Sequence, residues 1–126
     1  MGASVRQAPV VVLVVEDDSL LRMDAVQMLE EAGFAVLEAD NADHAIAMLE
    51  IRSDINVVFT DIQMPGSMDG FKLAQAIRGR WPPVKIIATS GYFLEMNIDL
   101  PEGGYFIPKP YDAQRVAAII HEMMAL

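Results

Sequence analysis

The sequence contains no cysteine, so disulfide bridges, thiolate metal sites and cysteine nucleophiles are excluded. Long apolar stretches are also missing, because the longest run, Val10–Val15, has far too few residues to cross a bilayer. The first residues, Met1–Pro9, carry one arginine and no long apolar segment follows them, unlike a secretory signal. We therefore expect a cytoplasmic protein without membrane attachment.

Basic residues are scarce. Nine Lys and Arg stand against 18 Asp and Glu, giving a formal net charge of −9, and the basic residues form no cluster. Because nucleic-acid backbones are bound by clustered Lys and Arg, we do not expect direct nucleic-acid binding. An acidic domain is better suited to binding cations or a protein partner.

Apolar residues are abundant, at 53% of 126 residues, which suffices for the core of one domain. Short β-branched runs alternate with longer stretches of helical periodicity. The pattern predicts strands at 10–15, 34–38, 55–60, 84–89 and 105–107, and helices at 19–32, 42–52, 70–79 and after 112. This alternation indicates an α/β fold with a parallel sheet between two layers of helices. We expect residues 1–9 to form a flexible arm and 10–126 to form the domain.

One stretch departs from the alternation. Tyr92–Gly104 should hold a helix between the fourth and fifth strands, but it contains Pro101 and two glycines and has little helical periodicity. We predict a loop there, or at most one or two helical turns.

Polar residues follow four of the predicted strands. In a parallel α/β sheet, ligands bind beyond the carboxyl ends of the strands. The residues at those ends are Glu16-Asp17-Asp18, Asp61, Thr89-Ser90-Gly91 and Pro108-Lys109-Pro110. Neighbouring carboxylates repel one another and need a cation or protons, and hard oxygen ligands favour Mg²⁺. Among such groups an aspartate is placed for nucleophilic attack on phosphorus, with a lysine and a serine to contact the phosphoryl oxygens.

Each of these signals also has a simpler interpretation. The three acidic residues at 16–18 suit the cap and dipole of the first helix. Asp61 suits an ordinary loop, and Lys109 and Ser90 suit turns. Their occurrence at successive strand ends favours a shared site, because folding alone does not require it.

Four motifs together resemble the receiver domain of two-component response regulators, over about Val10–Ala125. They are VVLVVEDD (11–18), the TDIQMPG and MDG pieces of the loop at 60–70, ATSG (88–91) and PKPY (108–111). The resemblance implies a flavodoxin-like three-layer sandwich whose five-stranded parallel sheet has the order 2-1-3-4-5. The chain between Ser90 and Lys109 is shorter than usual in the family, so we expect the fourth helix to be short or absent. The loop after Asp61 is about one residue longer than its commonest form.

The resemblance also implies a magnesium site. Asp61 corresponds to the phosphoacceptor, and Asp17 and Asp61 correspond to direct Mg²⁺ ligands. Glu16 would act through a water, and Gln63 would offer its backbone carbonyl.

Three further roles follow from the same resemblance. Lys109 corresponds to the invariant lysine, and its bond to Pro110 is expected to be cis. Ser90 corresponds to the switch hydroxyl, with Thr89 as the alternative register. Phe106 corresponds to the aromatic switch residue.

The implied function is that of a phosphoacceptor, phosphorylated on Asp61 by a histidine kinase or histidine phosphotransferase, which then changes its protein contacts. Such a domain catalyses only its own phosphorylation and dephosphorylation. Tyr92 and Gln63, near the site in sequence, predict a long-lived phosphoryl state. Three alternatives stay open: a receiver from a longer protein, a Mg²⁺-dependent phosphohydrolase forming an aspartyl-phosphate, and a pseudo-receiver that acts without phosphorylation. The phosphohydrolase would typically need a second aspartate where Gln63 stands.

Overall fold

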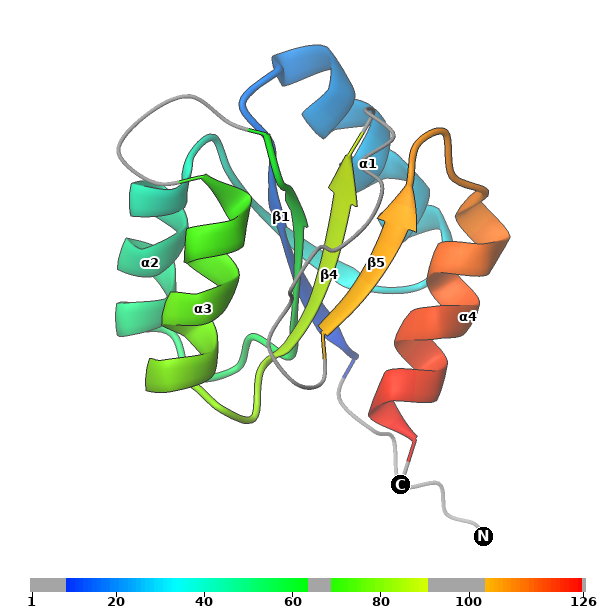
Figure 1. The fold of residues 1–126 in the computed structure, drawn as a ribbon. Helices are drawn as coiled ribbons and strands as arrows, with labels where there is room; N and C mark the ends of the chain where they lie inside the picture. Colours follow the sequence, from blue (N-terminus) through cyan, green and yellow to red (C-terminus); the bar gives the residue numbers. More distant parts are fainter. Residues whose placement is uncertain (1–8, 64–68, 91–103, 126) are drawn as a thin grey trace, which may run out of the picture.

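A computed structural model describes residues 9–63, 69–90 and 104–125 of the chain. Its sheet has five parallel strands in the order β2-β1-β3-β4-β5 (Figure 1). The strands are β1 (Val11–Val15), β2 (Ala35–Ala39), β3 (Val57–Asp61), β4 (Lys85–Ser90) and β5 (Gly104–Pro108). This order confirms the flavodoxin-like fold.

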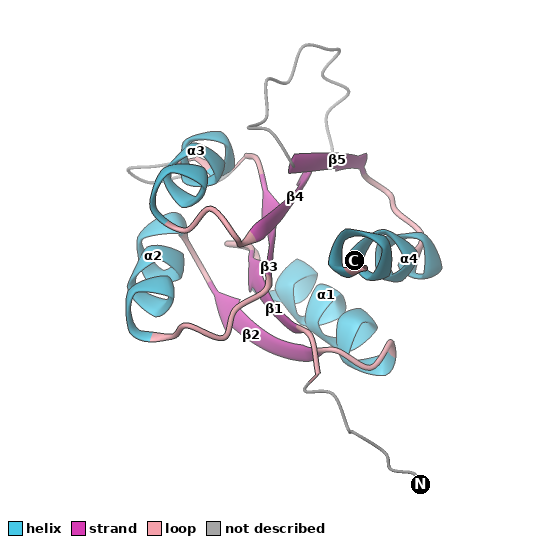
Figure 2. Ribbon diagram, turned by 90° about the horizontal axis from the view of Figure 1, so that it is seen from below, coloured by secondary structure: helices cyan, strands magenta, loops and turns pink. Residues whose placement is uncertain are grey.

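Helices cover both faces of the sheet. The view along the strands shows α1 (Ser19–Glu31) and α4 (Ala113–Met124) on one face, and α2 (Ala42–Ile51) and α3 (Gly70–Arg80) on the other (Figure 2). Each helix begins after an Asp or Asn whose side chain accepts a backbone N–H of the first turn. Within the described ranges, no helix has the length and apolar character needed to span a bilayer.

The predicted elements are found with small shifts at their ends. The third strand was expected to begin at Ile55 but begins at Val57, because Asn56 uses its side chain as well as its backbone to bond Val11. The same strand extends to include Asp61. The expected short or absent helix between β4 and β5, the longer loop after Asp61 and most of the N-terminal arm fall at 91–103, 64–68 and 1–8, outside the described residues.

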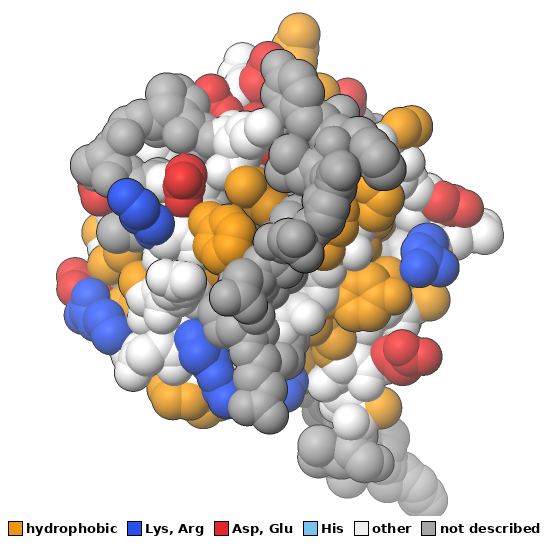
Figure 3. All heavy atoms as spheres, in the orientation of Figure 1, with side chains coloured by type: hydrophobic (Ala, Val, Ile, Leu, Met, Phe, Trp, Pro, Cys, Tyr) orange, Lys and Arg blue, Asp and Glu red, His pale blue; other side chains and the backbone are white. Residues whose placement is uncertain are grey.

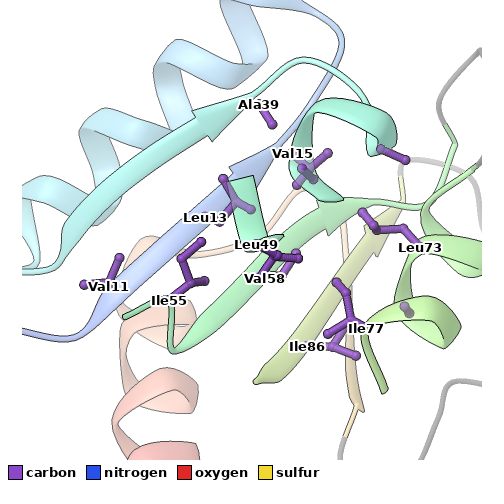
Figure 4. Packing of buried hydrophobic residues seen from close by; sticks show 13 residues of the cluster. Val11, Leu13, Val15, Ala39, Leu49, Ile55, Val58, Leu73, Ile77 and Ile86 are labelled. Carbon is purple, nitrogen blue, oxygen red and sulfur yellow. The ribbon is translucent and has the colours of Figure 1, made fainter. Parts of the chain in front are cut away.

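Strand alternation divides the core into two clusters. Figure 4 shows side chains of β1, β3 and β4 pointing toward α2 and α3, among them Leu13, Val58 and Ile86. The residues next to these along each strand point to the opposite face, toward α1 and α4. Because successive side chains of a strand alternate between faces, the position of a residue along its strand decides which helices it meets.

The first turn of α1 differs from the sequence-based expectation. In the sequence, Leu20 and Leu21 stand at helical spacing with Ala25 and Leu29, which predicts that they share the apolar side of the helix, yet they are 71% and 45% exposed. Asp18 caps the helix just beyond the end of β1, so its first turn extends past the sheet edge and has no strand to cover it (Figure 1). Only later residues of α1, Ala25 and Leu29, are buried.

Gly70 brings the start of α3 against the backbone of β3. Its N–H donates to the Ile62 carbonyl at 2.9 Å. A Cβ at this position would collide with the carbonyl oxygen of Asp61 and approach the Ile62 Cα. The absence of a side chain at Gly70 therefore lets the helix support the residue at the end of β3.

Two glycine substitutions in α3 test this close approach. We expect Gly70→Ala to lower the free energy of unfolding by about 1–3 kcal/mol, because backbone must shift to admit the methyl group. Gly79→Ala is the matched control: its Cβ would meet open space, so alanine should stabilise the helix by about 0.5–1 kcal/mol. Urea unfolding measures both values, and equal effects of the two substitutions would contradict the assignment.

Candidate functional site

The alternation of side chains places four polar residues on one face of the sheet. Val14, Phe59, Ile87 and Ile107 all point into the cluster beneath α1 and α4. Two residues after these four, in the same order, come Glu16, Asp61, Thr89 and Lys109. Glu16 and Lys109 still bond the neighbouring strands, through Glu16 N–H to Ala39 and Lys109 N–H to Ser90, so the alternation continues to them. The carboxyl edge of this face therefore carries two carboxylates, a hydroxyl and an ammonium.

Lys109, after β5, forms ion pairs with the two carboxylates at this edge of the sheet. The Lys109 Nζ donates to Asp61 Oδ2 at 2.9 Å and lies 3.5 Å from Glu16 Oε1. Burial alone would lower the pKa of the Lys109 ammonium, but the hydrogen bond and charge of Asp61, joined by Glu16, outweigh it and raise that pKa. The lysine therefore stays charged between the two carboxylates.

Glu16 is the most perturbed acid of the group. Burial, offset in part by the backbone N–H of Asp18 and increased by the charge of Asp61, raises the pKa of Glu16 from 4.5 to about 7. Arg22 fixes the same segment, because its Nη1 donates to the Glu16 carbonyl at 2.8 Å and its Nε to Glu38 at 3.1 Å. Burial is thus the main reason that Glu16 keeps its proton to a higher pH, and the charge of Asp61 adds to the effect.

Gln63 and Ser90 form a second contact beside Asp61. The Gln63 backbone N–H donates to Asp61 Oδ1 at 3.0 Å, so both carboxylate oxygens of Asp61 accept a hydrogen bond. The Ser90 hydroxyl, almost fully buried, donates to Gln63 Oε1 at 3.3 Å. Alternation along β4 directs Ser90 toward the α2–α3 side, whereas Thr89 shares the face of Asp61.

Thr89 carries a hydroxyl with unsatisfied hydrogen-bonding capacity. In the described part of the chain, its Oγ1 is the buried side-chain polar atom that has no hydrogen-bond partner. Burying a polar group without a hydrogen-bond partner lowers the stability of the fold by about 1–3 kcal/mol, because the group loses its bonds to water. The β3–β4 register sets Thr89 directly beside Asp61.

The remaining predicted residues lie around this centre. Asp17 is exposed at the end of β1, and the neighbouring Asp18 takes the capping role considered for the acidic run. Phe106 is half-buried on β5. Because it directly precedes Ile107, its side chain points to the opposite face of the sheet. The Lys109–Pro110 bond is cis, as expected.

The donor set fits a magnesium ion. Glu16 and Asp61 offer hard carboxylate oxygens, and both contact the same Lys109 ammonium, so they stand close together. Within residues 9–63, 69–90 and 104–125, no three His, Cys, Asp or Glu side chains stand close enough to hold a metal, so Asp17 does not complete a cluster. Mg²⁺ keeps several waters and uses one or two protein carboxylates, so two acids suffice.

Two supporting residues were not identified from the sequence. Gly70 packs against the backbone of Asp61, and Arg22 bonds the backbone of Glu16. These contacts support the site residues through their backbones and leave the carboxylates themselves untouched. The glycine after an aspartate cap at a helix start was a usable signal, because such a glycine often marks a close backbone approach. The role of Arg22 depends on a tertiary contact that no local pattern shows.

The pKa of Glu16 predicts a pH-dependent effect of Glu16→Gln. A carboxyl group with a raised folded pKa stabilises the fold fully below its unfolded value of 4.5, and this contribution is lost as pH rises through about 7. The glutamine avoids that loss. In a chelator, without divalent cations, we expect the variant to match the wild type near about pH 4.5 and to be about 1–3 kcal/mol more stable near about pH 8. Chemical unfolding at both pH values measures the difference, and a pH-independent difference would contradict the raised pKa.

Comparisons with known proteins agree with this geometry. Residues 12–121 match the response regulator receiver domain. Response regulator receiver protein CpdR of Brucella abortus is 31% identical over 116 residues, covering 90% of this chain and 95% of CpdR. Sensor kinase CckA of the same organism is 32% identical over 117 residues, and DNA-binding transcriptional regulator NtrC of Salmonella typhimurium is 30% identical over 118. This chain spans only 12% and 25% of those two longer proteins.

Solved structures give the same result. The receiver domain from the hybrid histidine kinase CckA superposes with a TM-score of 0.76 at 29% identity, covering 91% of this chain and 99% of that one. A response regulator receiver protein from Sinorhizobium medicae gives a TM-score of 0.83 at 27% identity, covering 91% and 94%. Receiver domains are generally non-enzymatic signalling modules that bind Mg²⁺ in an acidic pocket and interact with histidine kinases. The chain belongs to the response regulator receiver domains of two-component signalling.

Proposed function

We propose that this receiver accepts a phosphoryl group on Asp61 from a histidine kinase or histidine phosphotransferase. The observation that carries the proposal is the contact of Lys109 Nζ with Asp61 Oδ2 at 2.9 Å, at the carboxyl edge of the sheet. A partly buried lysine between two carboxylates offers a positive charge to incoming phosphoryl oxygens. The same contact favours a phosphorylated receiver over a pseudo-receiver, which would not need it.

The proposed transfer is a displacement at phosphorus. A carboxylate oxygen of Asp61 forms the new O–P bond while the bond from phosphorus to the donor's histidine nitrogen breaks, and the nitrogen keeps the electron pair. Asp61 Oδ2 accepts from Lys109 and Oδ1 from Gln63 N–H, so these contacts orient the carboxylate while the attacking oxygen uses its remaining lone pair. The lysine then stays within reach of the transferred oxygens.

A magnesium ion would neutralise the phosphoryl oxygens in this acidic pocket. From the correspondence with the receiver family we propose Asp17 and Asp61 as direct ligands, with Glu16 acting through a water and Gln63 through its backbone carbonyl. The paired carboxylates of Glu16 and Asp61, which both contact the Lys109 ammonium, support a cation at this edge. Asp17 forms no three-acid cluster with them in the described structure, so its role as a ligand rests on the family correspondence alone.

Phosphoryl transfer would change the surface offered to a partner protein through two residues, Ser90 and Phe106. The Ser90 hydroxyl would donate to a phosphoryl oxygen and leave its present position, and half-buried Phe106 on the neighbouring strand would change its exposure. β4 and β5 are paired from Ile86–Gly104 to Ser90–Pro108, which gives a direct route between them. The downstream partner would recognise this altered surface.

The surface beside Asp61 suits a protein donor. A pocket of about 470 Å³ is lined by Glu16, Lys109 and Tyr111 together with Leu21, Asp24 and Pro110. Exposed Leu20, Leu21 and Met23 lie along the first turns of α1, at the same edge. On the face seen in the space-filling view, Lys and Arg side chains are scattered and Asp and Glu side chains occur on the same face, which does not favour nucleic acid (Figure 3).

Intact-mass spectrometry with a small phosphodonor tests the proposal. Incubation with acetyl phosphate and Mg²⁺ should add one phosphoryl group to the wild type, because Asp61 supplies the nucleophile. Asp61→Asn should add none, since the amide oxygen is a far weaker nucleophile. Removing Mg²⁺ with a chelator should slow the wild-type reaction by tenfold or more, roughly the effect of losing one metal contact to the phosphoryl group.

Two substitutions in the same assay decide which hydroxyl acts. Ser90→Ala should slow phosphorylation, whereas Thr89→Val should match the wild type. An adduct of equal amount on Asp61→Asn, or none on any form in Mg²⁺, would reject the proposed function.

A further inference from the structure

Gln63 contacts both the phosphoacceptor and the switch hydroxyl. Its backbone N–H donates to Asp61 Oδ1 at 3.0 Å, while its side-chain Oε1 accepts from Ser90 Oγ at 3.3 Å. The backbone contact is available to any residue at this position except proline, but the side-chain contact depends on the glutamine amide. The Gln63 side chain thus has a role separate from that of its backbone.

The Gln63–Ser90 contact occupies the hydrogen that a phosphoryl group would need. A serine hydroxyl carries a single hydrogen and donates one hydrogen bond at a time. Ser90 is 1% exposed, so water competes poorly for that hydrogen, whereas Gln63 is exposed. Alternation along β4 also turns Ser90 away from the Asp61 face, so reaching a group on Asp61 requires the hydroxyl to leave Gln63.

We propose that the Gln63 side chain stabilises the unphosphorylated state by accepting the Ser90 hydroxyl, and so opposes binding of a phosphoryl group at Asp61. Gln63 is then a positioning residue that acts through Ser90. The inference rests on the proposed phosphoacceptor function and adds a residue that sets the balance between the two states. One neutral hydrogen bond changes such an equilibrium by about two- to tenfold.

Beryllium fluoride with Mg²⁺ tests the proposal, because it binds a carboxylate as a non-covalent tetrahedral mimic of a phosphoryl group. Gln63→Met keeps the length of the side chain and removes the amide oxygen. Isothermal titration calorimetry should show two- to tenfold tighter binding to Gln63→Met than to the wild type. Gln75→Met, at an exposed position of α3, is the control for the substitution itself and should bind like the wild type.

A Ser90→Ala background separates this role from a general change of structure. Without the hydroxyl there is nothing for Gln63 to hold, so Gln63→Met should leave the affinity of Ser90→Ala unchanged. Unaltered or weaker binding to Gln63→Met, or an equal gain in the Ser90→Ala background, would reject the role of Gln63 while leaving the phosphoacceptor intact. Failure of the wild type to bind at all would instead reject the proposed function, and this inference with it.

Discussion

The ion pair between Lys109 and Asp61 is the constraint on which the rest of the site depends. Lys109 follows β5 and Asp61 ends β3, so the lysine must cross the whole of β4 to reach its partner. Only a long side chain on the same face as Asp61 can do this, which requires the strand register and the sheet order found here. A slip of one residue in β5 would direct the ammonium to the opposite face of the sheet.

Because Glu16 and Asp61 share one ammonium, a charge added at this edge of the sheet would change the contacts of Lys109. Glu16, which follows the adjacent β1, shares one ammonium with Asp61, and its burial together with the charge of Asp61 raises its pKa. A bound cation would reduce the repulsion between the two carboxylates, and a group attached to Asp61 would share or displace Lys109. Two contacts with the backbone support this edge of the sheet. Gly70 packs against the Asp61 carbonyl, and Arg22 donates to the Glu16 carbonyl.

Much of this arrangement follows from the sequence. Apolar runs and helix caps predict the elements, and the rule that ligands bind at the carboxyl ends of parallel strands selects Glu16, Asp61 and Lys109 before any geometry is known. Local patterns were wrong about Leu20 and Leu21, because periodicity shows that one side of a helix is apolar and not whether a strand lies beneath it. The collision that Gly70 avoids also arises between distant segments.

The hydroxyl residues show a second limit. The motif favours Ser90 over Thr89, but only side-chain positions show that Ser90 bonds Gln63 and that Thr89 lies unpaired beside Asp61. The expectation that Tyr92 prolongs the phosphoryl state stays a prediction, since that residue lies outside the described part of the chain.

Chemical mapping of the modified residue can show directly whether Asp61 is the residue that accepts the phosphoryl group. Borohydride reduces an acyl phosphate to an alcohol, so a phosphorylated aspartate becomes homoserine, which peptide mass spectrometry can locate. After treatment with a phosphodonor and Mg²⁺, we expect homoserine at position 61 and unchanged carboxylates at Glu16 and Asp17. Homoserine at position 17, or a phosphoryl group on another residue with Asp61 intact, would contradict it.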